Sequence, residues 1–224
     1  MTGCLYCIDN DIIKKLATFE LFDETINLFE ADSTDVRVLA TAKYKFQGDL
    51  DKLKKGRLRQ PGAKLVNYER TIELAKTLPQ IAQAEVDSDL FEQLSMFEGI
   101  DAGEAVLTTY LAQVLQKDKT GEAFILTGDK RYLKALARVA LPELKVLFAN
   151  RFWCLEQLIL RGIYEYGFEA VRDKIVPVRD CDNACKAVFG SGDRSTAENV
   201  TLTISGYIET LRAETNDLLH LYAG

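Results

Sequence analysis

The stretch Cys4-Leu5-Tyr6-Cys7-Ile8-Asp9-Asn10-Asp11-Ile12-Ile13 decides the fold. Its apolar run at residues 5–8 predicts a buried strand, and the helical spacing of apolar residues over 11–22 predicts a helix directly after it. Asp9 and Asp11 therefore stand where the chain leaves the sheet. Because open α/β sheets bind their ligands at the carboxyl ends of the strands, this stretch predicts an acidic site there.

The rest of the chain alternates between strand and helix patterns. Further strands are predicted at residues 36–40, 123–127 and 145–149, and helices at residues 49–55, 69–78, 101–116, 129–142 and 152–163. Residues 41–46 either continue the second strand or begin a helix. The alternation predicts an α/β fold, a three-layer α/β/α domain with a small parallel sheet, over residues 1–164. Residues 165–224 are expected to form a helical C-terminal extension, in which the capping box Ser195-Thr196-Ala197-Glu198 opens a long helix.

Composition excludes several classes of protein. A chain of 224 residues with 47% hydrophobic and 28% charged residues is typical of a globular protein. It has no apolar run near the roughly 20 residues that span a bilayer and does not begin like a secretory signal, so we expect a cytoplasmic protein and no membrane partner.

Cysteine and histidine patterns argue against soft-metal chemistry. Five cysteines, an odd number, suit a reducing compartment. The pairs Cys4/Cys7 and Cys181/Cys185 formally allow a zinc site, but buried core thiols are the simpler interpretation. His220 is the one histidine of the sequence, so neither a histidine-based metal site nor a Ser-His-Asp triad is expected.

Positive charge is concentrated in one segment. The net charge is −6, yet residues 43–70 hold nine Lys or Arg against three acids. Two interpretations stay open: a solvated surface insertion, or an electrostatic track for a nucleic-acid backbone. The track would consist of Lys52, Lys54, Lys55, Arg57, Arg59 and Lys64. Tyr44, Phe46 and Tyr68 are candidate stacking surfaces for bases, whereas Trp153 is expected in the core.

Two later stretches also place acids at helix starts: Asp101-Ala102-Gly103-Glu104-Ala105 and Thr127-Gly128-Asp129-Lys130-Arg131. Carboxylates that converge from several elements hold Mg²⁺ or Mn²⁺ in sites of phosphodiester cleavage. Each stretch also has a structural interpretation, because Asp101 with Glu104 forms a capping box and Asp129 can cap its own helix. Asp11 is expected to cap the first helix while Asp9 faces the centre.

In this order the three stretches resemble a PIN domain, a nuclease fold with a small parallel sheet. Asp9-Asn10-Asp11 matches the acid and polar turn that end the family's first strand, and the other two stretches match its Gly-Glu-Ala helix start and its Thr-x-Asp-Lys/Arg turn. The resemblance covers residues 4–160. One feature departs from it: the acid that the family usually carries on the helix after the second strand has no counterpart in Ala40-Thr41-Ala42-Lys43-Tyr44-Lys45.

The resemblance implies a Mg²⁺- or Mn²⁺-dependent endonuclease, with RNA preferred to DNA because many relatives are ribonucleases, including toxins and defence effectors. It implies catalytic and metal-binding roles for Asp9, Asp101, Glu104 and Asp129. Asp9 and Asp129 would be direct ligands, and Glu104 would ligate or orient the attacking water. Asp11, Thr127 and Lys130 would stand behind these ligands, with Lys130 or Arg131 also able to touch phosphate.

Two alternatives remain open. The missing acid is compatible with a PIN-like scaffold that binds nucleic acid without cutting it, and the helical parts leave room for a protein partner or a homodimer. Alternatively, Asp9-Asn10-Asp11 satisfies the Asp-x-Asp motif of an Asp-nucleophile phosphatase or phosphotransfer domain.

Overall fold

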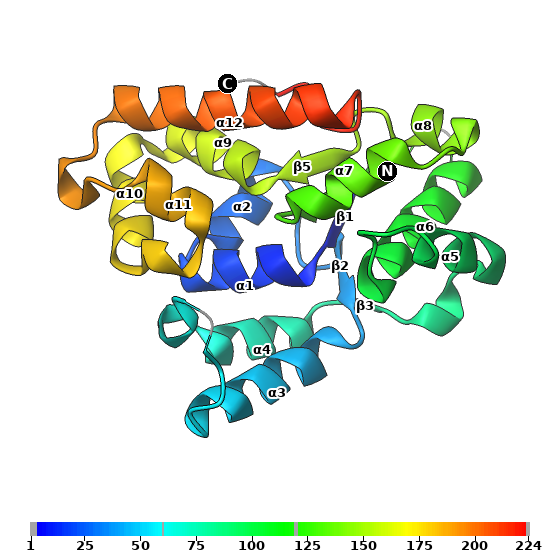
Figure 1. Ribbon diagram of the computed structural model, residues 1–224, viewed down its shortest axis with the longest axis horizontal. Coiled ribbons are helices and arrows are strands. Elements are labelled where there is room, and N and C mark those ends of the chain that lie inside the picture. Colours follow the sequence, from blue (N-terminus) through cyan, green and yellow to red (C-terminus); the bar gives the residue numbers. More distant parts are fainter. Residues whose placement is uncertain (1–3, 60, 119–120, 223–224) are drawn as a thin grey trace.

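The protein is built on a fully parallel sheet (Figure 1). The computed structural model describes residues 4–59, 61–118 and 121–222. Within them the strands are β1 (Leu5–Ile8), β2 (Val36–Leu39), β3 (Gln80–Ile81), β4 (Ala123–Thr127) and β5 (Phe152–Cys154), in the order β3-β2-β1-β4-β5. All five residues of β4 are buried, as in a parallel sheet covered on both faces. The predicted three-layer α/β fold is confirmed.

The strand order reverses between β1 and β4. From β1 the chain builds outward through β2 to β3, and it then returns to place β4 and β5 on the other side of β1. The two strands are in register, with Ile8 opposite Leu126, so their carboxyl ends lie side by side. A reversal of this kind opens a crevice outside the strand ends, and this is where sheets of this class bind ligands.

Helices connect the strands and cover the sheet (Figure 1). They are α1 (Asn10–Thr18), α2 (Phe22–Leu28), α3 (Ala42–Lys54), α4 (Tyr68–Thr77), α5 (Ser88–Ser95), α6 (Ala102–Lys117), α7 (Lys130–Arg138), α8 (Pro142–Phe148) and α9 (Leu155–Tyr166). The alternative left open for residues 41–46 is thereby decided in favour of a helix. Within the described part of the chain, every helix is too short or too polar to cross a bilayer.

The C-terminal region packs onto the same core. It contains α10 (Phe168–Ile175), the 3₁₀ turn η3 (Val176–Cys181), α11 (Asn183–Val188) and α12 (Ala197–Thr215), and α12 lies along α9 and α7 (Figure 1). Leu219 pairs in parallel with Phe152, and the His220 backbone N–H donates to the Phe152 carbonyl at 2.8 Å. The helical character of this region is confirmed, and its status as a separate unit stays a prediction.

The fifth strand was predicted in the wrong place. Residues 145–149 lie mostly within α8, and β5 occupies the start of the segment predicted as a helix. Pro142 favours a helix start at its own position. Leu144 and Phe148 are buried whereas Val146 is 82% exposed, which is a helical and not an alternating pattern.

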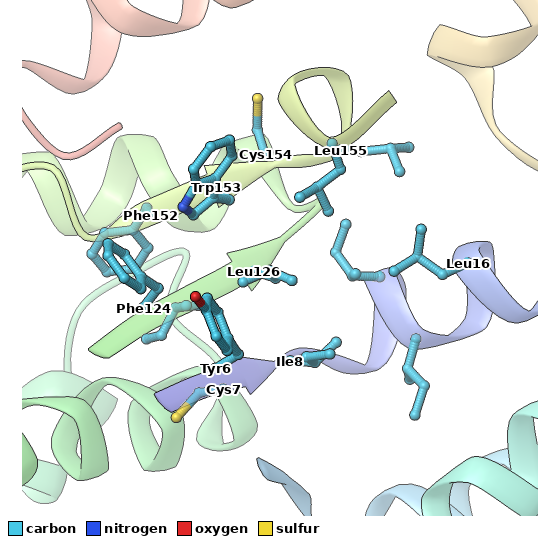
Figure 2. Close-up of a cluster of buried hydrophobic side chains, with 14 of the residues drawn as sticks. Tyr6, Cys7, Ile8, Leu16, Phe124, Leu126, Phe152, Trp153, Cys154 and Leu155 are labelled. Carbon is cyan, nitrogen blue, oxygen red and sulfur yellow. The ribbon is translucent and has the colours of Figure 1, made fainter. Parts of the chain in front are cut away.

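The aromatic residues of the basic segment are also corrected. Phe46 and Tyr68 are 1% and 5% exposed and belong to the core, so they cannot stack on bases. Tyr44 is 71% exposed, with the Lys43 ammonium over its ring. Trp153 is buried as predicted, in the apolar cluster formed by β1, β4 and β5 (Figure 2).

Candidate active site

The predicted acids line one cavity. A hollow of about 80 Å³ lies outside the carboxyl ends of β1 and β4, and its charged lining consists of Asp9, Asp11, Lys45, Asp101, Glu104 and Asp129. A second hollow, of about 240 Å³, shares Asp101, Glu104 and Asp129 with the first and extends to Arg131. We call the first hollow the acid cavity. Segments far apart in the sequence thus bring carboxylates to the switch point of the sheet.

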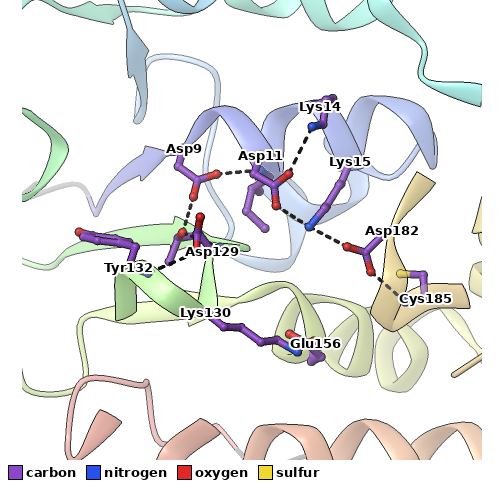
Figure 3. A network of polar contacts seen from close by, with 12 residues as sticks. Asp9, Asp11, Lys14, Lys15, Asp129, Lys130, Tyr132, Glu156, Asp182 and Cys185 are labelled. Carbon is purple, nitrogen blue, oxygen red and sulfur yellow. Dashed lines mark hydrogen bonds and ion pairs between the residues drawn. The ribbon is translucent and has the colours of Figure 1, made fainter. Parts of the chain in front are cut away.

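Asp9 is held by both of its carboxylate oxygens. One accepts the backbone N–H of Ile12 at 2.8 Å, and the other accepts the hydroxyl of Thr127 from β4 (Figure 3). Asp9 is therefore the N-cap of α1 as well as part of the acid cavity. The expectation that Asp11 caps this helix is wrong, because Asn10 is already helical and Asp9 is the last extended residue of the strand.

Capping also places the other acids. Asp101 accepts the Glu104 N–H at 2.9 Å, and the Glu104 carboxylate accepts the Asp101 N–H at 2.7 Å, which completes the capping box of α6. Asp129 caps α7 by accepting the N–H groups of Arg131 and Tyr132 at 2.8 and 3.2 Å. Capping and cavity lining are performed by the same side chains. The N-termini of α1, α6 and α7 therefore all adjoin the cavity, where their dipoles favour negative charge.

The carboxylates nevertheless repel one another. Burial raises the pKa of Glu104 to about 8, and the charges of Asp101, Asp129 and Asp9 add to this rise. Burial raises the pKa of Asp9 to about 6, with the charge of Asp11 next in importance. Neutral forms of these acids are favoured because burial and nearby like charges both penalise ionisation. The acid cavity thus holds more negative charge than its surroundings compensate.

Lys45 is the site residue that the sequence did not reveal. It lies in the first turns of α3, faces the acid cavity, and forms no ion pair with any described residue. The PIN-domain resemblance predicts an acid on the helix after β2, so a lysine here has the opposite charge to the one expected. The signal was present in the sequence: the first turns of a helix that follows a strand lie at the strand's carboxyl end.

Two other lysines near the acid cavity are held in ion pairs (Figure 3). Lys15 of α1 pairs with Asp11 and, at 2.8 Å, with Asp182 of the C-terminal region. Lys130 pairs with the buried Glu156 of α9 at 2.5 Å, so its ammonium is engaged on the side away from the acids that it was predicted to support. Burial lowers the pKa of Lys15, but the charges of Asp11 and Asp182 raise it by more, so the ammonium stays ionised.

A glycine lets these groups approach. A Cβ atom on Gly128, in the turn between β4 and α7, would lie 2.5 Å from the Asp11 carboxylate and 3.0 Å from the Lys15 ammonium. A larger residue at this position would displace the ends of these two side chains. Gly128 therefore leaves room for the ion pair behind the acid cavity.

The predicted nucleic-acid track lies on the surface outside the acid cavity. Its six residues, Lys52, Lys54, Lys55, Arg57, Arg59 and Lys64, are all exposed. Lys52 follows Lys45 by two turns of α3, roughly 10 Å along the axis and on the same helix face. The acid cavity and the basic surface are thus joined by one face of α3, and a role of that surface in binding stays a prediction.

The donor chemistry of the cavity fits Mg²⁺ or Mn²⁺, because carboxylate oxygens are the hard ligands that these ions prefer. Capping uses one oxygen of Asp101 and one of Glu104, and the second oxygen of each accepts no hydrogen bond from a described residue. No preformed metal-binding group of three or more His, Cys, Asp or Glu occurs among the described residues. The oxygens that face the cavity would therefore have to draw together around an ion.

Comparison of the chain with family models, with curated proteins and with solved structures gave no match. The PIN-domain resemblance consequently rests on the three motifs and their order, and it stays a prediction.

Proposed function

We propose that the protein is a divalent-metal-dependent endonuclease that cleaves RNA at the acid cavity. One observation carries the proposal: carboxylates from distant segments line a single cavity at the switch point of the sheet, where burial and neighbouring acids raise the pKa of Glu104 and Asp9. Such crowding is costly unless a cation compensates it. The expectation of a cytoplasmic enzyme belongs to the same proposal.

The roles follow from the contacts of each residue. Asp101, Glu104 and Asp129 would hold a Mg²⁺ or Mn²⁺ ion with the oxygens not used in capping. The ion would supply the positive charge that acidifies a water and neutralises the phosphate. Asp9 is fixed by Thr127 and adds negative charge to the cavity floor. Glu104 would ligate the ion or orient the attacking water with its free oxygen.

The test is Asp9→Asn, which keeps an oxygen for the cap of α1 but removes the charge. We expect Mn²⁺-dependent cleavage of single-stranded RNA to fall by about 100-fold or more, with an unchanged circular dichroism spectrum. Asp23→Asn is the matched control, because Asp23 is an exposed acid of α2 that pairs with Arg70 outside the cavity. Equal cleavage by wild type and Asp9→Asn would refute the proposal.

Lys45 favours a second candidate, a nucleic-acid-binding module that does not cleave. A lysine in the cavity wall is a built-in cation that competes with a metal ion. Calorimetry distinguishes the two functions: RNA binding without measurable Mn²⁺ affinity at millimolar ion would establish the binding module. The phosphatase alternative has less support, since Asp9 is 6% exposed and hydrogen-bonded through both oxygens.

A further inference from the structure

Lys15 joins the acid cavity to the C-terminal region. This lysine is almost fully buried on α1, so its charge needs anions close by. One is Asp11, which also lines the acid cavity. The other is Asp182, which reaches Lys15 from the start of α11 (Figure 3).

Asp182 is itself held firmly. One carboxylate oxygen lies 2.8 Å from the Lys15 ammonium, and the other accepts the Cys185 backbone N–H at 2.8 Å as the N-cap of α11. The side chain of Asp182 is 11% exposed. Its position is therefore fixed by α11, independently of the acid cavity.

Because Lys15 pairs with both Asp11 and Asp182, Asp182 affects how far the Asp11 charge is neutralised beside the cavity. With Asp182 present, the ammonium is compensated from behind. Without Asp182, the buried ammonium would have Asp11 as its remaining ion-pair partner among the described residues. Asp11 already contacts this ammonium, so the positive charge that Asp182 no longer compensates would lie beside the acid cavity and oppose a cation there.

A neighbouring contact ties the basic segment to the same place. Gly62 has a positive φ of 73°, and a Cβ atom there would overlap the carbonyl group of Asp180. Residues 180–182 therefore touch the basic segment through Gly62 and the acid cavity through Lys15. The C-terminal region is built against both parts of the proposed site.

We propose that Asp182 is a positioning residue of the acid cavity, which acts through Lys15 on Asp11. The consequence for metal binding rests on the proposed function, whereas the change in the electrostatic surroundings of Asp11 does not. By this inference the C-terminal region completes the site.

The first variant is Asp182→Asn, because asparagine preserves the cap of α11 and removes only the charge. We expect the Kd for Mn²⁺, measured by calorimetry on the full chain, to rise roughly tenfold, as for other residues that support a metal ligand. We also expect the carboxylate and amide NMR signals of Asp9 and Asp11 to shift. Asp182→Ser, which also caps but carries no charge, serves if Asp182→Asn does not fold.

Glu24→Gln is the matched control. It breaks the ion pair between Lys174 of α10 and Glu24 of α2, which also joins the C-terminal region to the α/β domain but does not line the acid cavity. A comparable loss of stability is expected, with unchanged Mn²⁺ affinity and unchanged Asp9 and Asp11 signals. An equal effect of both variants on Mn²⁺ affinity would overturn the inference.

The double variant shows whether Asp182 acts through Lys15. In a Lys15→Met background, Asp182→Asn is expected to change the Kd less than about twofold, because no ammonium remains to be compensated. A full tenfold effect in that background would overturn the inference. If the wild type binds no Mn²⁺, the proposed function fails, and the Asp9 and Asp11 signals alone decide the role of Asp182: unchanged signals in Asp182→Asn refute it.

Discussion

The acid cavity and the aromatic cluster around Trp153 differ in how well their charged side chains are compensated by their neighbours. In the cluster the guanidinium of Arg161 lies 4.8 to 5.7 Å from the rings of Phe29, Trp153 and Tyr222, and donates to the Leu28 carbonyl. His220 stacks on Trp153 with ring centroids 4.3 Å apart. The Arg161 charge is thus accommodated by neighbours that stabilise it.

In the acid cavity five carboxylates share the lining with one lysine, Lys45. The two regions therefore serve different purposes. In the aromatic cluster most local interactions stabilise one another, as expected where a region serves stability, although the buried Trp153 indole N–H has no hydrogen-bond partner among the described residues. Local interactions conflict in the acid cavity, and conflicts of that kind concentrate at functional sites. Variants in the two regions should therefore differ in the sign of their effect on stability.

The largest effect is expected for Trp153→Ala. Removal of this buried ring deletes its contacts with Phe29, His220 and Tyr222, so the free energy of unfolding should fall by about 3–5 kcal/mol. Urea denaturation followed by circular dichroism measures it. A loss below about 1 kcal/mol would be small for a buried aromatic residue replaced by alanine, and it would show that the cluster contributes little to stability.

A smaller loss is expected for Gln157→Ala. The Gln157 amide donates to the carbonyls of His220 and Tyr222 at 2.8 and 3.2 Å, and its oxygen accepts the Cys154 N–H. Truncation leaves the buried Cys154 N–H unpaired and leaves the two carbonyls with their contacts to Arg212 at 3.2 and 3.5 Å, at a cost of about 1–3 kcal/mol. Hydrogen exchange should show faster exchange at residues 218–222 than elsewhere. Uniform exchange along the chain would contradict this anchoring role.

Glu104→Gln is expected to act in the opposite direction in metal-free protein. The folded pKa of Glu104, about 8, lies above its ordinary value of 4.5, so between these pH values the folded state binds the proton more tightly. Stability contributed by the protonated form is therefore lost as pH rises from 4.5 to 8. At pH 8 the variant should be more stable than wild type by on the order of 1–2 kcal/mol, after discounting for solvent.

Urea titrations from pH 4 to pH 9 test this sign. The variant should keep only the shallower decline due to Asp9, whose folded pKa is about 6. Mn²⁺ should reverse the order of stability, because the wild type gains binding free energy that the variant largely forfeits. Parallel pH profiles for the two proteins would show that Glu104 is not under electrostatic stress.

The smallest effect is expected for Lys45→Glu, an exposed residue of the cavity wall. Replacing the cation by an acid should tighten Mn²⁺ binding by about three- to tenfold, or roughly 0.6–1.4 kcal/mol, while weakening RNA binding. Calorimetry and fluorescence anisotropy measure the two. Lys43→Glu is the control on the same helix, because Lys43 pairs with Gln80 and lies over Tyr44 outside the cavity lining. Equal effects of the two variants on Mn²⁺ and RNA binding would show that Lys45 is not part of the site.

The sequence predicted those features that depend on neighbouring residues. Asp9, Asp101 and Asp129 could be located because each follows an apolar run or opens a helix, and parallel strands bring their carboxyl ends together. Phe46 was misjudged because composition places it in a basic segment, whereas the geometry of α3 turns it inward. The error at β5 arose because a short apolar run fits both a strand and a helix.

Partners distant in sequence could not be predicted. The sequence around Lys15 does not predict its pairing with Asp182, and the sequence around Lys130 does not predict its pairing with Glu156. These ion pairs form only after the helices have packed. The sequence showed that residues 40–45 lack the expected acid, but it did not show that Lys45 lines the cavity. The direction of the Lys45 side chain depends on where α3 begins. The prediction therefore included the acids of the cavity and Thr127 beside Asp9, but not the acids that pair with Lys15 and Lys130.

The parallel pairing of Leu219 with Phe152 bears on how the chain is made. Translation delivers residues from the N-terminus, so β5 is synthesised well before the segment that covers its edge. Until residue 219 has emerged from the ribosome, the outer edge of β5 lacks this neighbour. A polypeptide that stops short of residue 219 exposes an open strand edge prone to aggregation.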